Sequence, residues 1–322
     1  MKRPLRIALI GNIIREYSAF VLGTREGIFL LGHRFRGIDF RYSTPKFIRQ
    51  QLFEFRPDYI FTHMILNAQI GKTPQTLQIL KDVKDRFGTR VIHTMQDARE
   101  TSRFPQKIKD FVDIGLLNQT QCIKDFEKVW GIPCYYWPYG CMKQSEMADP
   151  VGDLHFDMIY TGNMIDGIYA ERTRFVRQLA NCINLKVVET QSVGDLRART
   201  PELAVSAGAV LGVGLRYDLE GYIDVRPFQY CGAGALLITH EYNGMDKVFE
   251  YGKHLVTFSG YDPQTVVELL NYYLEDKDEA DEIREAGFEY TQRCHNYCVR
   301  VGDVIDVLEG KRDRPRVFLD DF

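Results

Sequence analysis

A carboxylate and two arginines follow an apolar run in the first third of the chain. An expected strand over residues 90–94 ends just before Asp97, and Arg99 and Arg103 come after it. In an open α/β sheet, the carboxyl end of a strand is the usual place for catalytic groups. Ordinary strands also stop there, and Asp97 could merely cap the segment that follows.

A second group of polar residues follows an expected strand over residues 156–160. The strand runs into Gly162 and Asn163, and Arg172 lies at the start of the next expected helix. A glycine lets backbone N–H groups approach a phosphate closely, and an arginine adds a fixed positive charge. Because a strand, a glycine and a helix also make an ordinary turn, this pattern alone is weak.

A third group lies on an expected helix over residues 226–231. Arg226 and Gln229 are three residues apart and share one helix face, and Gly234 follows before an apolar strand at residues 235–239. An arginine suits a diphosphate, and a polar side chain one turn further on suits a ribose. The alternative is a helix packed on a sheet with its polar residues in water.

Strands and helices alternate along the whole chain, which predicts an α/β protein with parallel sheets. A helix is expected over residues 73–87, with Pro74 in its first turn and Gly88 just past its end. A Pro/Gly-rich stretch over residues 137–153 has the composition of a linker between domains. We therefore expect two Rossmann-like domains facing across a cleft, residues 1–150 and 151–322, with the last helix crossing back to the first domain.

The expected strands of the first domain cover residues 6–10, 37–42, 59–63, 90–94, 114–117 and 134–137. Those of the second cover residues 156–160, 185–189, 209–213, 235–239 and 254–258.

The third group resembles the donor half of GT-B glycosyltransferases, especially the CgeB-like group. Their pattern is roughly R-x-F-E-A-x-A-x-G-A, in which the acid binds the nucleotide ribose. Arg226, Phe228 and Gly234 are in register with it, but Gln229 stands where the acid belongs. The resemblance implies a UDP-sugar as co-substrate and ribose binding through an amide.

A narrower resemblance, to phage DNA β-glucosyltransferases, covers more of the chain at low identity. Thr161-Gly162 with Glu171-Arg172, and the segment Ile223 to Gln229, are similar to their donor motifs. Their T-D-I-R motif carries the catalytic base, and residues 96–99 (Gln-Asp-Ala-Arg) sit at the matching place. The resemblance implies that Asp97 is the general base of an inverting displacement, with Gly162, Asn163, Arg172 and Arg226 binding the donor. Retaining CgeB-like enzymes need no base here.

The charge is divided between the two halves. Residues 1–150 hold 23 Lys/Arg and 15 Asp/Glu, a net charge of +8, and residues 151–322 hold 18 and 29, a net charge of -11. A basic half favours an anionic partner. We expect double-stranded DNA as the partner and a hydroxymethylated pyrimidine, 5-hydroxymethylcytosine in phage DNA, as the acceptor. Asn12, Arg15, Arg99 and Arg103 would line the acceptor side.

Three alternatives stay open. The first is a CgeB-like transferase acting on a cell-surface or small-molecule hydroxyl, and the second is a non-catalytic nucleotide-sugar or nucleic-acid binding protein. A sugar-nucleotide epimerase of the same fold is the third.

No metal dependence is indicated, since the seven cysteines are scattered without a CxxC pair and the Asp-x-Asp at residues 276–278 lies in a charged helical stretch. The short apolar run near the N-terminus predicts neither a signal peptide nor a spanning helix, so a cytoplasmic protein without membrane association is expected.

Overall fold

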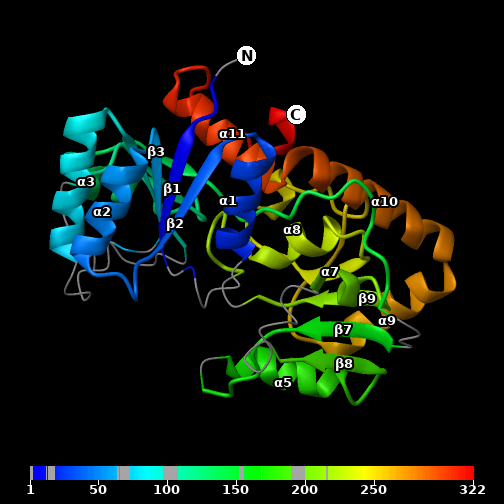
Figure 1. The fold of residues 1–322 in the computed structure, drawn as a ribbon. Helices are drawn as coiled ribbons and strands as arrows, with labels where there is room; N and C mark the ends of the chain where they lie inside the picture. Colours follow the sequence, from blue (N-terminus) through cyan, green and yellow to red (C-terminus); the bar gives the residue numbers. More distant parts are fainter. Residues whose placement is uncertain are drawn as a thin grey trace. The chain divides into compact units, whose positions relative to one another are not determined.

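The computed structural model describes residues 3–11, 13, 19–63, 65, 73–96, 108–151, 156–167, 169–189, 200–214 and 217–322. The chain forms two compact units, each built around its own parallel sheet (Figure 1). The first unit comprises Met1–Pro138 and Tyr297–Val317, and the second comprises Tyr139–Asn296 and Phe318–Phe322. The expected α/β class with two Rossmann-like parallel sheets is confirmed.

The sheet of the first unit has the strand order β2-β1-β3-β4-β5-β6, and all its pairs are parallel. The strands are β1 (Arg6–Gly11), β2 (Arg34–Asp39), β3 (Tyr59–His63), β4 (Arg90–Met95), β5 (Ile114–Leu117) and β6 (Cys134–Tyr136). The helices are α1 (Ala19–Leu30), α2 (Pro45–Phe55), α3 (Thr73–Phe87), α4 (Ile123–Trp130) and α11 (Tyr297–Leu308).

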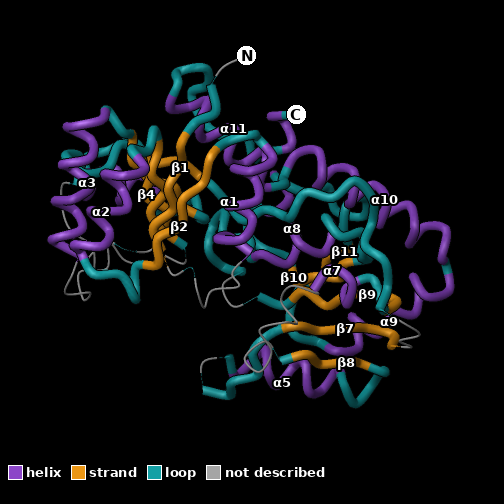
Figure 2. Tube along the Cα trace, in the orientation of Figure 1, coloured by secondary structure: helices purple, strands orange, loops and turns teal. Residues whose placement is uncertain are grey.

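Both faces of this sheet are covered by helices. Successive residues of a strand point to opposite faces, and each set packs in its own core. On β1, Ile7 and Leu9 join a core with residues of α1 and α11. Ala8 and Ile10 join a second core with residues of α2, α3 and α4. The purple helices on the two sides of the orange strands in Figure 2 are these two layers.

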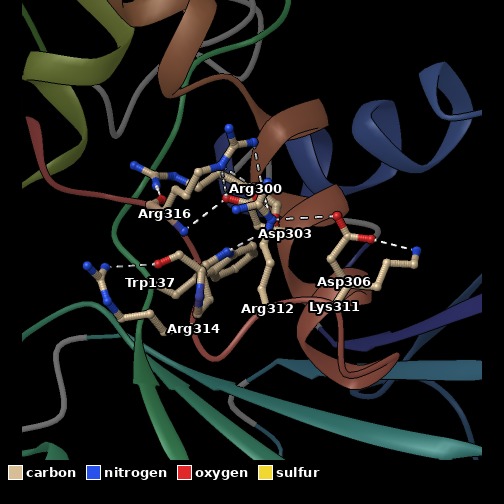
Figure 3. Close-up of polar contacts among 9 residues, drawn as sticks. Trp137, Arg300, Asp303, Asp306, Lys311, Arg312, Arg314 and Arg316 are labelled. Carbon is tan, nitrogen blue, oxygen red and sulfur yellow. Dashed lines mark hydrogen bonds and ion pairs between the residues drawn. The ribbon is translucent and has the colours of Figure 1, made fainter. Parts of the chain in front are cut away.

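A polar cluster holds the returning C-terminal segment in the first unit (Figure 3). The Asp303 carboxylate, 3% exposed, accepts from the backbone N–H of Arg316 at 2.9 Å and from its Nη2 at 3.0 Å. Arg300 Nη1 donates to the Arg316 carbonyl at 2.8 Å, and the Arg300 carbonyl accepts from Trp137 Nε1 at 3.3 Å. These bonds join the three segments of the first unit that lead to the other unit, at residues 137–138, 297–300 and 316–317.

The sheet of the second unit has the strand order β11-β10-β9-β7-β8, again parallel throughout. Its strands are β7 (Phe156–Thr161), β8 (Leu185–Val188), β9 (Ala207–Gly212), β10 (Leu237–His240) and β11 (Val256–Phe258). Its helices are α5 (Ala170–Leu179), α7 (Thr200–Ala204), α8 (Val225–Cys231), α9 (Pro263–Glu275) and α10 (Lys277–Cys294), with short 3-10 turns η2 (Met245–Lys247) and η3 (Leu319–Asp321). Asp276 of the Asp-x-Asp pair caps α10, accepting from the Glu279 N–H at 3.1 Å.

The expected strands differ from the observed ones by at most two residues at either end, with one exception. The expected strand over residues 37–42 is observed at Arg34–Asp39, because Asp39 ends it with a turn. The Asp39 carboxylate accepts from the backbone N–H groups of Arg41 at 2.9 Å and Tyr42 at 3.3 Å. These bonds leave Tyr42 outside the strand, where it is exposed.

Candidate active site

The carboxyl ends of the strands in the second unit meet at one edge of its sheet. Register pairs join Tyr160 of β7 to Leu211 of β9, and Gly212 of β9 to Thr239 of β10. Because all the strands are parallel, Thr161, Gly212 and His240 end them at the same edge. This is the edge at which ligands bind in open α/β sheets.

Arg226 is fixed at this edge by two partners. Its Nε and Nη2 donate to the Thr161 carbonyl at 3.2 and 2.9 Å, and its Nη1 donates to the Asp224 carboxylate. Asp224 also caps α8 by accepting from the Arg226 backbone N–H at 2.8 Å. One carboxylate thus starts the helix and orients its arginine.

The Arg226 guanidinium is a permanent cation in a largely buried place. Burial alone would lower its pKa, but Asp224 and the surrounding tyrosine hydroxyls outweigh that and raise the pKa. A guanidinium has five N–H groups, of which three are used on Thr161 and Asp224. Among the described residues, one N–H on each terminal nitrogen has no further partner, and it could bind an anionic ligand.

Gly162 lies against this guanidinium. A Cβ added at Gly162 would be 2.8 Å from Arg226 Nη2 and 2.4 Å from the Tyr160 hydroxyl. Every larger residue would therefore displace one of these groups. The structure brings together Gly162 and Arg226, which are far apart in the sequence.

Arg172 holds the loop that follows β7. Its Nη2 donates to the Asn163 carbonyl at 2.6 Å, and its guanidinium lies 4.0 Å from the centre of the Tyr169 ring. The side chain is 6% exposed, and its Nε has no hydrogen-bond partner among the described residues. Arg226 and Arg172 therefore bind carbonyls two residues apart, the first at the end of β7 and the second on the loop that follows.

Gln229 and Gly234 lie further along α8. Gln229 is half-buried, one turn after Arg226 on the same helix. Gly234 follows the helix with a φ of 86°, accepts from Arg284 Nε at 3.0 Å, and would meet Met147 if it carried a Cβ. The contacts of Gly234 are those of a turn residue. Its predicted part in binding the UDP-sugar stays a prediction.

Three tyrosines at this edge were not among the predicted site residues. The Thr161 hydroxyl is hydrogen bonded to the hydroxyl of Tyr230. Burial raises the pKa of Tyr230, and burial together with Asp224 raises the pKa of Tyr242. The Tyr160 hydroxyl is buried without a partner among the described residues. One feature of the sequence could have pointed to this group: Asp224, an aspartate directly before the expected helix.

The predicted acceptor-side residues Asn12, Arg15, Asp97, Arg99 and Arg103 lie outside the described residues. The strands that precede Asn12 and Asp97 in the sequence are described. β1 ends at Gly11, and β4 ends at Met95.

Two neutral histidines are buried beside these strand ends. Burial lowers the pKa of His63 and of His93 to about 3. His93 Nδ1 is 2.7 Å from the Thr62 hydroxyl, and His63 Nδ1 is 3.0 Å from the Thr94 hydroxyl.

In the described part of the chain, no group of three or more His, Cys, Asp or Glu is arranged to hold a metal ion. None of its helices has both the length and the apolar composition that crossing a membrane requires.

Comparison with known proteins gives a family-model match over part of the chain and a likeness of fold. Residues 172–306 match the family model described as "Glycosyl transferase-like". No curated protein sequence matches the chain.

Several solved structures are similar over nearly the whole chain. Sucrose-phosphate synthase from Thermosynechococcus elongatus has a TM-score of 0.62 at 12% identity, covering 96% of this chain and 100% of that one. Anabaena Alr3699/HepE in complex with UDP-glucose has a TM-score of 0.60 at 10% identity, covering 95% and 100%. The β-glucosyltransferase of phage T4 in complex with UDP-glucose has a TM-score of 0.56 at 12% identity, covering 94% and 98%.

Proposed function

We infer that this protein, which has the GT-B fold and carries a glycosyl transferase-like domain, transfers a sugar from a UDP-sugar to a hydroxyl acceptor. The observation that carries the inference is the oriented guanidinium of Arg226 beside Gly162. Both lie at the ligand-binding edge of the second unit, which contains most of the matched residues.

The chemistry of the leaving group fits this edge. When the bond between the sugar and the diphosphate breaks, negative charge develops on the diphosphate oxygens. A cation that is already oriented stabilises that charge without reorganising. We assign this role to Arg226, with Arg172 and the backbone at Gly162 and Asn163 completing the phosphate site. Gln229 would bind the ribose through its amide.

Asp97 is proposed as the general base. It would take the proton of the acceptor hydroxyl while that oxygen attacks the anomeric carbon and the diphosphate leaves from the opposite side. The anomeric configuration is then inverted. Support comes from the position of Asp97, two residues after the end of β4.

The proposed acceptor is 5-hydroxymethylcytosine in duplex DNA. The net charge of +8 on residues 1–150 and the structural likeness to the phage T4 β-glucosyltransferase support it. Asn12, Arg15, Arg99 and Arg103 would contact this substrate. A base inside a duplex would have to be flipped out to reach Asp97.

A small-molecule or cell-surface hydroxyl is the second candidate acceptor. The sucrose-phosphate synthase structure, which is named for a small-molecule product, has a higher TM-score than the phage enzyme, and this favours the alternative. The non-catalytic alternative rests on Gln229 at the position of the family's acid.

The test is UDP release from a panel of UDP-sugars with hydroxymethylcytosine DNA, unmodified DNA or no added acceptor. We expect release that depends on hydroxymethylated DNA and is lost in Asp97→Asn, while UDP binding persists. UDP release that does not depend on DNA would favour a small-molecule or cell-surface hydroxyl as the acceptor. UDP-sugar binding without turnover, unaffected by Asp97→Asn, would favour the non-catalytic alternative.

A further inference from the structure

Two large aromatic side chains are exposed where β2 leads into α2. Tyr42 is 55% exposed and Phe47 is 46% exposed. Arg41 and Lys46, which precede them in sequence, are also exposed. The Arg41 guanidinium lies 5.7 Å from the centre of the Tyr42 ring. We call Arg41, Tyr42, Lys46 and Phe47 the edge patch.

A fixed turn presents this patch. The Asp39 carboxylate accepts from the N–H of Ile13 at 2.7 Å, in addition to its bonds to Arg41 and Tyr42. Asp39 is 7% exposed, so its charge faces backbone donors rather than solvent. Thr44 then caps α2 by accepting from the Phe47 N–H at 3.2 Å. The exposed charge of the edge patch is therefore positive, and its backbone is held in place.

The edge patch lies on the functional edge of the first sheet. Gly11 of β1 is in register with Asp39 of β2, and His63 of β3 is in register with Thr94 of β4. Because the strands are parallel, β1, β2, β3 and β4 all end at this edge. It is the edge at which the chain continues to Asn12 and Asp97.

The composition of the patch fits a nucleic acid. Cations neutralise phosphates, while aromatic rings pack against sugars and bases. An amphipathic helix that lies on a membrane exposes an apolar face. The apolar residues Ile48 and Leu52 of α2 are instead buried in the core.

We propose that the edge patch docks the backbone of duplex DNA. Arg41 and Lys46 contact phosphates, and Tyr42 and Phe47 pack against the nucleotides next to the acceptor base. This rests on the proposed function, in which the acceptor is DNA. It adds Arg41, Tyr42, Lys46 and Phe47 to the DNA contacts that the proposed function assigns.

The first experiment measures how DNA binding depends on salt, by fluorescence anisotropy of a labelled short duplex without any UDP-sugar. Each phosphate contact that is removed lowers the slope of log K against log salt by about 1. Arg41→Ala/Lys46→Ala should therefore lower the slope by about 2. The matched control is Lys124→Ala/Lys128→Ala, which removes two exposed lysines from α4 and should leave the slope unchanged.

The second experiment separates docking from folding and from donor binding. Tyr42→Ala/Phe47→Ala should reduce sugar transfer to DNA, while the affinity for UDP and the urea midpoint stay at wild-type values. Phe29→Ala is the control, because Phe29 is equally exposed, at 55%, in the last turn of α1.

The outcomes distinguish this proposal from the proposed function. If the wild type binds duplex DNA and both edge-patch variants behave like their controls, the edge patch does not dock DNA, and the proposal of a DNA acceptor stands. If the wild type binds no duplex, the docking surface and the DNA acceptor both fail, while UDP-sugar transfer to another hydroxyl stands. If Arg41→Ala/Lys46→Ala loses binding only to vesicles of anionic phospholipid, the surface serves a membrane and the proposal is overturned.

Discussion

The guanidinium of Arg226 binds the backbone carbonyl of Thr161 through two nitrogens, at 3.2 and 2.9 Å. This contact joins the first turn of α8 to the end of β7, across 65 residues of sequence. It orients the cation that we assign to the leaving diphosphate, and it depends on the fork of N–H groups that only arginine has.

Arg226→Lys should therefore lose most of its transfer activity although its charge is kept. A lysine has one nitrogen and cannot bridge Thr161 and a ligand in the same way. Removing one oriented donor to a developing anion costs roughly 10²- to 10³-fold in kcat, and we expect a loss of that size. Arg177→Lys on α5 is the control, because Arg177 is exposed and pairs with Asp166 at the surface. Equal kcat values for the two variants would contradict the assignment.

Gly162→Ala should weaken UDP binding, because the new methyl group would lie 2.4 Å from the Tyr160 hydroxyl and 2.8 Å from Arg226 Nη2. Overpacking of this kind costs about 1–3 kcal/mol of stability. Adding Tyr160→Phe removes the hydroxyl, and it should restore part of the UDP affinity and part of the stability that Gly162→Ala loses. Calorimetric titration with UDP and urea denaturation measure the two effects. If the second substitution brings no recovery, the steric explanation is wrong.

The buried histidines should make the first unit sensitive to acid. Burial lowers the pKa of His63 and of His93 to about 3, whereas an unfolded histidine titrates near 6.5. Between these values the unfolded chain binds more protons, so stability falls as the pH falls below about 6.5. Each one-proton difference corresponds to about 1.4 kcal/mol per pH unit.

Urea denaturation between pH 7.5 and 4.5 tests this expectation. His63→Gln/His93→Gln should show a flatter dependence on pH than the wild type, whatever its stability at pH 7.5. Parallel curves would show that these two histidines do not titrate on unfolding.

Asp303→Ala should destabilise the first unit by about 1–3 kcal/mol, since it removes a buried carboxylate that accepts from the Arg316 backbone and guanidinium. Arg316 would lose its carboxylate, and the C-terminal segment would lose its anchor on α11 (Figure 3). Asp306→Ala should cost below about 1 kcal/mol, because its pair with Lys311 is more exposed. Equal urea midpoints for the two variants would contradict the role given to Asp303.

The elements that follow from local signals were predicted best. The helix expected over residues 73–87 is observed at Thr73–Phe87, because its proline start and glycine stop are encoded within the segment itself. The strand expected over residues 37–42 was misplaced, because the bonds that end it at Asp39 also involve Ile13, a residue of another loop.

The sequence indicated residues of the candidate site, but not which of them contact one another. Arg226, Gly162 and Arg172 were predicted to bind phosphate because of their residue types at strand and helix ends, and that role stays a prediction. The bond between Arg226 and Thr161, and the tyrosines around them, depend on strand order, which no short motif specifies. Tyr160 reads as an ordinary strand residue, although its hydroxyl lies beside Gly162.

Sugar transfer to DNA is tested most directly by mass spectrometry of nucleosides from hydroxymethylcytosine DNA that has been incubated with the protein and a UDP-sugar. We expect a sugar on the hydroxymethylated base, formed by the wild type and absent with Asp97→Asn. UDP release without any sugar on the DNA would contradict the proposed acceptor.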